Sequence, residues 1–204
     1  MTGKILTRVY PNPPIDKKEV LRYAAVSGES EEILELLEAV VAEALPTLSG
    51  RVCYTEFDIK ECESHLELGF TKSESKSLKA ALAGCEKIIL FAATVGGEID
   101  RLTSKYAITS GAKAVLLQAL GAERIEAVAD AFSEDIKSEA AACGYSVTKR
   151  FSPGYKDLSL ALQKDIFSAL DCPRKIGLTL GESLIMSPTK SITAIIGLKK
   201  NENH

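Results

Sequence analysis

The chain has 204 residues and a formal net charge of −3, with 46% apolar and 26% charged residues, which is ordinary for a soluble globular protein with one core. A nucleic-acid-binding surface needs an excess of Lys and Arg, so this charge balance argues against a nucleic-acid partner. The longest apolar run, Ile88 to Val95, is far shorter than the roughly 20 residues that cross a membrane, so we expect no membrane span and a cytoplasmic protein.

Residues 1–50 are expected to form an N-terminal arm and a helical segment. Three prolines keep residues 1–14 extended. Apolar residues at helical spacing predict a long helix over Glu31 to Leu45, and a short helix is expected over Lys17 to Ala25. Glutamates crowd the longer helix. They are either a solvated face or a docking surface for a basic partner.

Residues 51–198 are expected to form the main unit, to make one structural unit with 1–50, and to begin with strands. Short strands are predicted over Arg51 to Leu68, with Val52, Tyr54 and Phe57 on one side. A helix over Lys72 to Ala83 and a strand over Ile88 to Val95, buried on both faces, follow. The next two residues, Gly96 and Gly97, favour a tight turn over an anion-binding loop.

The second half of the main unit is expected to start with the longest helix, Ser110 to Cys143. Then come a strand or loop to Tyr155 and a helix near Leu160 to Leu170 that Pro173 closes. Three short strands are predicted at Ile176–Leu180, Ser183–Ser187 and Ser191–Leu198, before a polar tail, Lys199 to His204. Helices and strands do not alternate regularly, which predicts an α+β fold with a twisted antiparallel sheet and packed helices.

The cysteines and histidines point to no metal site and no catalytic triad. The five cysteines are widely spaced with no Cys-x-x-Cys, so we expect reduced, structural thiols. The chain has only two histidines, His65 and His204, so a Ser-His-Asp catalytic triad is not expected. We therefore expect neither a metal nor a catalytic residue in this chain.

The segment Arg150 to Tyr155 fits the pattern Arg-x-x-x-Gly-Tyr. Downstream come Gly181-Glu182-Ser183 and Pro188-Thr189-Lys190-Ser191, and then Ile195-Ile196-Gly197-Leu198. This succession resembles the activation, or reactivation, domain of vitamin B12-dependent methionine synthase, most closely its separately encoded, stand-alone form. The resemblance is strong over Arg150 to Leu198 and fair over Leu117 to Ile136. It is weak before Leu82.

The resemblance implies an S-adenosylmethionine site, and the residue types suit that ligand. Arg150 can hold the carboxylate with two parallel hydrogen bonds. Pro153 fixes the turn after Ser152, Gly154 permits close backbone approach, and Tyr155 offers an aromatic face to adenine or the sulfonium. Without the resemblance, the same residues would be read as a surface ion pair and a Pro-Gly turn.

Carboxylates are expected to complement the cationic groups of this ligand. Asp130 and Glu134 are four residues apart on one helix face and match the acidic helix of the family, although the sequence leaves open which one faces the ligand. Glu182 is a lower-ranked candidate. The chain departs from larger family members, which carry an N-terminal Asp-Trp segment and C-terminal paired tyrosines at the ligand. It contains no Trp, and Asp16 cannot be aligned with that Asp.

The family's role implies a subunit that is not self-sufficient as an enzyme. Its partner would be a cobalamin-binding methionine synthase chain, whose oxidised cob(II)alamin is reduced by a flavodoxin-like or other electron donor and remethylated from S-adenosylmethionine. Cobalamin would be present only through that partner, because the Asp-x-His-x-x-Gly signature is missing here. The alternative is a regulatory module that senses S-adenosylmethionine and docks on a corrinoid protein without methyl transfer.

Overall fold

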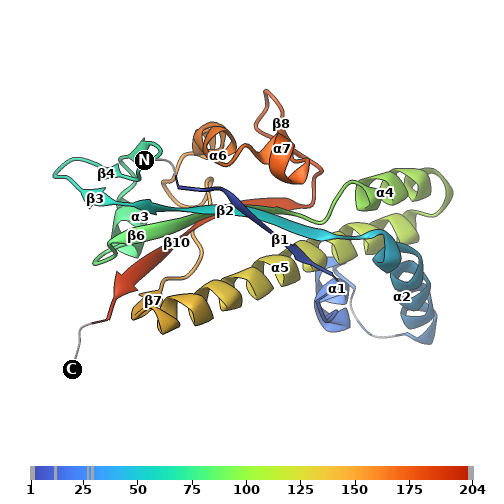
Figure 1. The fold of residues 1–204 in the computed structure, drawn as a ribbon. Coiled ribbons are helices and arrows are strands. Elements are labelled where there is room, and N and C mark those ends of the chain that lie inside the picture. The colour runs from blue at the N-terminus through green and yellow to red at the C-terminus, as the bar shows by residue number, and fades with distance from the viewer. Residues whose placement is uncertain (1–2, 12, 27, 29, 202–204) are drawn as a thin grey trace.

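A computed structural model describes residues 3–11, 13–26, 28 and 30–201, and it is built around a five-stranded antiparallel sheet (Figure 1). In spatial order the strands are β1 (Leu6–Tyr10), β2 (Gly50–Asp58), β6 (Lys87–Thr94), β10 (Ser191–Lys200) and β7 (Tyr145–Val147). The α+β class with a twisted antiparallel sheet, expected from the sequence, is confirmed. The central strand β6 is almost wholly buried, which its continuous apolar sequence predicts.

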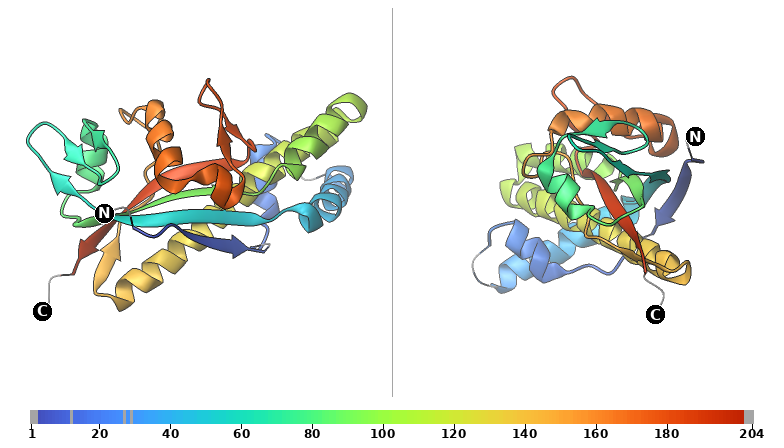
Figure 2. Two further views of the ribbon diagram at one scale, coloured as in Figure 1. Left: turned by 45° about the horizontal axis from the view of Figure 1, so that its top comes forward. Right: turned by 90° about the vertical axis from the view of Figure 1, so that its left-hand side faces the viewer.

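Helices cover both faces of this sheet (Figure 2). The helices are α1 (Lys17–Tyr23), α2 (Glu31–Ala44), α3 (Lys76–Ala81), α4 (Glu98–Thr109), α5 (Gly111–Ala142), α6 (Gln163–Leu170) and α7 (Cys172–Ile176), with single 3-10 turns at Leu45–Thr47 and Leu160–Leu162. One core lies between the sheet and α1, α2, α4 and α5. The second core lies on the opposite face, beneath α3, α6 and α7.

The longest helix, α5, lies along one face of the sheet (Figure 1). Its start is set by Ser110, which has an extended backbone and accepts a hydrogen bond from the Lys113 N–H at 3.5 Å. Phe132 is fully buried against the sheet, with its ring centroid 4.7 Å from that of Phe91 and 5.0 Å from that of Tyr54. This aromatic cluster fixes the helix on the central strands.

The N-terminal segment is tied to α5 by a buried ion pair. The side chains of Glu123 and Arg124 are 6% and 2% exposed. Arg124 Nη2 donates to Glu123 at 2.5 Å and to the Pro14 carbonyl at 2.8 Å, and Nη1 donates to the Pro13 carbonyl. The Asp16 N–H donates to Glu123 at 2.9 Å. The N-terminal arm therefore covers both charges and supplies hydrogen-bond partners to each.

The structure corrects the face assigned to Phe57. Val52 and Tyr54 belong to the core under α5, but Phe57 belongs to the opposite core. Successive side chains of a strand point to opposite faces, so the odd-numbered Phe57 faces away from Val52 and Tyr54. Apolar residues on both faces of β2 are buried, so an apolar side chain does not by itself show which face of the strand it belongs to.

Some predicted boundaries are also corrected. Helix α3 begins at Lys76 and not at Lys72, because Lys72–Ser73 forms β5 and pairs with β4 (Leu66–Glu67), which pairs in turn with β3 (Lys60–Glu61). Pro173 stands in the first turn of α7 instead of ending α6, a position that its missing N–H allows. The second predicted C-terminal strand is only β9 (Met186–Ser187), paired with β8 (Thr179–Leu180).

The two ends of the chain differ in part from expectation. Lys199 and Lys200 extend β10 and pair with Ser146 and Tyr145 of β7, so the polar tail does not begin at Lys199. Met1, Thr2 and Asn12 of the expected arm, and 202–204 of the expected tail, lie outside the described residues. Among the described helices, none combines the length and apolar content that crossing a bilayer requires.

Candidate functional site

The Arg-x-x-x-Gly-Tyr segment is an extended loop held against β10. Phe151 and Ile195 form a bridge with two hydrogen bonds, N–H to carbonyl in each direction, both 2.9 Å long. Phe151 is buried in the core beneath α6. Because neighbouring side chains of an extended segment point in opposite directions, Arg150 faces the other way, toward α5.

Arg150 meets two carboxylates of α5. Its Nη2 lies 2.6 Å from Asp130 Oδ1 and 3.2 Å from Glu126 Oε2, and its side chain is 20% exposed. The other terminal nitrogen, Nη1, is buried and has no hydrogen-bond partner among the described residues. A buried guanidinium donor without a partner is costly, so this nitrogen favours an acceptor from outside the chain.

Two hollows meet at Arg150, and Thr148, Lys149 and Arg150 line both. The first has a volume of about 600 Å³ and is completed by Ala81, Glu126, Phe151, Ser152, Tyr155, Lys156 and Ile192. The second has a volume of about 750 Å³ and is completed by Asp130, Ser133, Glu134, Lys137, Val147 and Ile196. Both volumes suit a small-molecule ligand.

The turn at Pro153 and Gly154 sets the position of Tyr155. Pro153 is buried, and Gly154 adopts φ 86° while its N–H donates to the Leu158 carbonyl at 2.8 Å. A side chain at Gly154 would be strained at this φ. Tyr155 is 56% exposed, and its ring packs edge-on against Phe151 with 5.4 Å between centroids. Lys156 Nζ lies over this ring, 5.5 Å from its centroid, so a ligand that stacks on Tyr155 would take the place of that ammonium.

Asp157 anchors the end of this loop to α3. Its carboxylate accepts from the Ser75 hydroxyl at 2.6 Å and from the backbone N–H groups of Lys76 and Ser77 at 2.8 and 3.2 Å. These donors, with the Ser75 hydroxyl first, lower the pKa of Asp157 from 3.8 to about 2. Asp157 thus positions the loop from outside the two hollows.

Replacement of Asp157 by alanine is expected to lower stability near neutral pH and to have a diminishing effect in acid. A carboxyl whose pKa is depressed in the folded state contributes stability that is complete above its unfolded pKa and is lost as the pH falls through its folded pKa. The difference in urea midpoint between wild type and Asp157→Ala should therefore shrink between about pH 4 and pH 2. A difference that stays constant over this range would contradict the anchor.

The structure brings together most of the site residues expected from the sequence. Arg150, Ser152 and Tyr155 border the first hollow, and Asp130 and Glu134 border the second. Glu134 also pairs with Lys137 at 2.9 Å. Glu182 lies exposed between β8 and β9 and lines neither hollow. Asp16, which could not be aligned with the family's Asp, caps the N-terminus of α1.

Glu126 was missed by the sequence analysis, although it contacts Arg150 directly. Its spacing contains the signal, because Glu126, Asp130 and Glu134 follow one another at intervals of four and share one face of α5. Lys149 and Thr148, which line both hollows, were also missed. These two carry no comparable signal, since they lie in irregular chain before the motif.

The acidic helix α2 is partly used within the chain. Glu38 pairs with Lys17. Glu43 accepts from the Tyr106 hydroxyl at 2.7 Å and from Lys105 at 3.3 Å, and the Tyr106 hydroxyl, then Lys105, lowers its pKa. The remaining glutamates, Glu31, Glu32 and Glu35, are exposed at the start of the helix. A docking role for this surface stays a prediction.

Comparison with known proteins gives a family match and a structural match. The family model described as "Vitamin B12 dependent methionine synthase, activation domain" matches residues 75–203. The solved structure described as "Crystal Structure of the MetH Reactivation Domain bound to AdoHcy" superposes with a TM-score of 0.73 at 17% sequence identity, covering 98% of this chain and 80% of that chain. No curated protein matches the sequence at a significant level.

Proposed function

The chain belongs to the family of vitamin B12-dependent methionine synthase activation domains, and we propose that it binds S-adenosylmethionine at the Arg150 loop. As a stand-alone subunit it would serve the reductive remethylation of cob(II)alamin held by a partner chain. The observation that carries this proposal is the buried, unpartnered Nη1 of Arg150 where the two hollows meet. The related domain bound to AdoHcy supports the same ligand class.

The residues around Arg150 fit the parts of this ligand. The carboxylate of S-adenosylmethionine would accept from Nη1, while Nη2 stays with Asp130 and Glu126. These two carboxylates also offer acceptors to the ligand's amino group. Tyr155 offers its exposed ring to the adenine or the sulfonium. Asp130 is 71% exposed on its side chain, so it can turn toward a ligand without breaking a packed core.

The partner's cobalamin, once reduced by an external donor such as a flavodoxin, would accept the methyl group of S-adenosylmethionine. The work of this chain is then to hold the methyl donor in one orientation at the meeting surface. Such positioning needs no catalytic acid or base from Arg150, Tyr155 or their neighbours. If α2 is the docking element, a basic surface of the partner would contact Glu31, Glu32 and Glu35.

A mixing experiment tests the remethylation role. The partner is a methionine synthase that lacks its own activation domain and is loaded with cob(II)alamin. With a reductant and S-adenosylmethionine, addition of this protein should convert the visible spectrum to that of methylcobalamin. Equal rates with and without the protein would overturn the role.

The same experiment separates the remethylation role from the alternative regulatory module. A protein that binds S-adenosylmethionine and the partner, yet leaves the rate unchanged, is a sensor that docks without methyl transfer. The Arg150→Ala variant serves as a matched control at limiting S-adenosylmethionine, because it removes the proposed carboxylate contact and leaves the rest of the chain intact. Its rate should fall below that of the wild type under this condition.

A further inference from the structure

The small hairpin of β3 and β4 carries a side-chain cluster that lies apart from the Arg150 loop. Cys62 and His65 flank the two-residue turn Glu63-Ser64, and the Cys62 N–H donates to the His65 carbonyl at 2.9 Å. Residues that face each other across a hairpin place their side chains on one face. Glu67 follows His65 by two positions in β4 and returns to that face. The spacing Cys-x-x-His-x-Glu therefore brings three different ligand types together.

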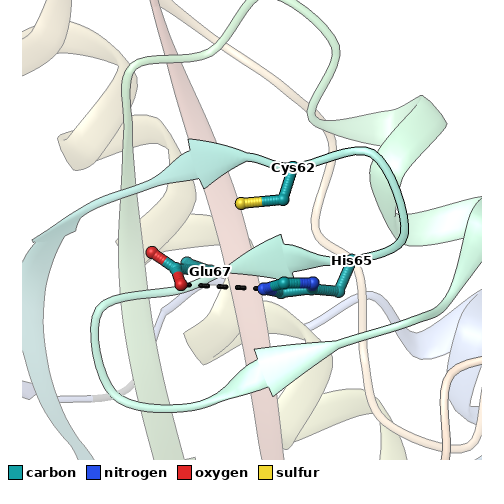
Figure 3. Close-up of side chains that lie close together, drawn as sticks. All are labelled: Cys62, His65 and Glu67. Carbon is teal, nitrogen blue, oxygen red and sulfur yellow. Dashed lines mark ion pairs between the residues drawn. The ribbon is translucent and has the colours of Figure 1, made fainter.

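The side chains do converge on this face (Figure 3). The Cys62 sulfur, a ring nitrogen of His65 and a carboxylate oxygen of Glu67 all lie within 4.8 Å of one another, and each residue is half-buried. His65 Nε2 lies 3.6 Å from Glu67 Oε1. Ligands of a tetrahedral zinc ion are about 3.5 Å apart, given metal–ligand bonds of about 2.0 to 2.3 Å. Rotations of these half-buried side chains can close the remaining distance.

His65 is oriented as a metal-binding histidine would be. Its Nδ1 lies 3.2 Å from the Ser64 hydroxyl, while Nε2 is shielded from solvent and has no hydrogen-bond partner in the described part of the chain. If Nδ1 carries the proton and donates it to Ser64, Nε2 presents its lone pair toward Cys62 and Glu67. A hydrogen bond from the second ring nitrogen is the usual way in which a protein fixes the tautomer of a metal ligand.

We propose that Cys62, His65 and Glu67 bind a divalent metal ion of the zinc class, with the fourth position open to water. Thiolate, imidazole and carboxylate are the ligands that zinc uses in proteins. Lys72 now lies 3.5 Å from Glu67 and would give way to the ion. The site goes beyond the proposed S-adenosylmethionine function and does not depend on it. The sequence has no Cys-x-x-Cys and was expected to hold no metal, whereas Cys62, His65 and Glu67 come together only by pairing across a turn.

The metal would also tie together a weak part of the fold. The sheet β3–β4–β5 has strands of two residues each, and such short ribbons are marginal without further support. An ion that bridges Cys62 at the end of β3 to Glu67 in β4 closes the hairpin across its turn. Protection of the hairpin amides from hydrogen exchange should rise when zinc is added.

Calorimetric titration of the chelator-treated 204-residue chain with zinc chloride tests the proposal. One ion should bind per chain, and cobalt(II) should give the charge-transfer absorption of a cobalt–thiolate bond. Cys62→Ser, His65→Ala and Glu67→Gln should each weaken binding by at least about tenfold, and Ser64→Ala by about tenfold through the ring orientation. Glu61→Gln, on the opposite face of the same hairpin, and Cys143→Ser, an exposed thiol elsewhere, are the matched controls.

Alkylation of the wild-type protein provides a readout that does not depend on variants folding correctly. Zinc should slow the labelling of Cys62 at least tenfold while the exposed Cys143 reacts at an unchanged rate. The proposal is overturned if zinc fails to bind, if Cys62→Ser binds as tightly as the wild type, or if zinc leaves the labelling of Cys62 unchanged. None of these results bears on S-adenosylmethionine binding, which is measured separately.

Discussion

Replacement of Arg124 by alanine is expected to lower the free energy of unfolding by about 3 to 5 kcal/mol, because it leaves the buried Glu123 carboxylate without its counter-ion. The same change removes the donors to the Pro13 and Pro14 carbonyls, which hold the N-terminal arm on α5. Urea denaturation of the purified variant measures the loss. Because the free energy of unfolding of a typical domain is about 5 to 15 kcal/mol, a loss of this size would leave the variant only marginally stable.

The matched control for Arg124 is Arg101→Ala. Arg101 also pairs with a helical glutamate, Glu98, at 2.7 Å, but its side chain is 64% exposed. Exposed pairs of this kind contribute only about 0.3 to 0.5 kcal/mol. Equal shifts in the two variants would show that the Glu123–Arg124 pair is not buried in solution. The double variant Glu123→Gln with Arg124→Met should recover part of the loss, since it removes both charges and keeps an acceptor for the Asp16 N–H.

Replacement of Arg150 by alanine is expected to weaken S-adenosylmethionine binding by roughly ten- to a hundredfold. A hydrogen bond to a charged group contributes about 1.5 to 3 kcal/mol, which converts to this range of affinity. Arg150→Lys keeps the charge, but a single ammonium cannot donate to the ligand as Nη1 would while a second nitrogen stays with Asp130 and Glu126, so it should recover little of the loss. Isothermal titration calorimetry of wild type and variants gives the affinities directly.

Arg174→Ala is the control for a general loss of positive charge. Arg174 lies at the surface of α7 with a side chain that is 85% exposed, and it lines neither hollow beside Arg150. Its removal should leave the affinity unchanged. An equal loss in Arg174→Ala and Arg150→Ala would mean that net charge, and not the carboxylate contact, governs binding. Absence of binding to the wild type, with the cobalamin partner present, would remove the proposed site altogether.

Elements with a local signal could be predicted from the amino-acid sequence. The apolar period of α2 and α5 depends only on residues three and four apart, and the buried run of β6 on its own composition. Asp130 and Glu134 could be placed on one helix face for the same reason. The turn in the Arg-x-x-x-Gly-Tyr loop is visible too, because proline restricts φ and glycine permits a positive φ wherever they stand.

Which charges are buried and which residues meet depends on contacts between distant segments, and these could not be predicted. Glu123 and Glu126 look alike in the sequence, yet the arm at Pro13 and Pro14 covers the first, while the second remains half-exposed beside Arg150. Cys62, His65 and Glu67 share a face only because the chain turns back at Glu63-Ser64. The free energy of a charge or a ligand set depends on what packs around it, and those neighbours come from distant segments that no local period records.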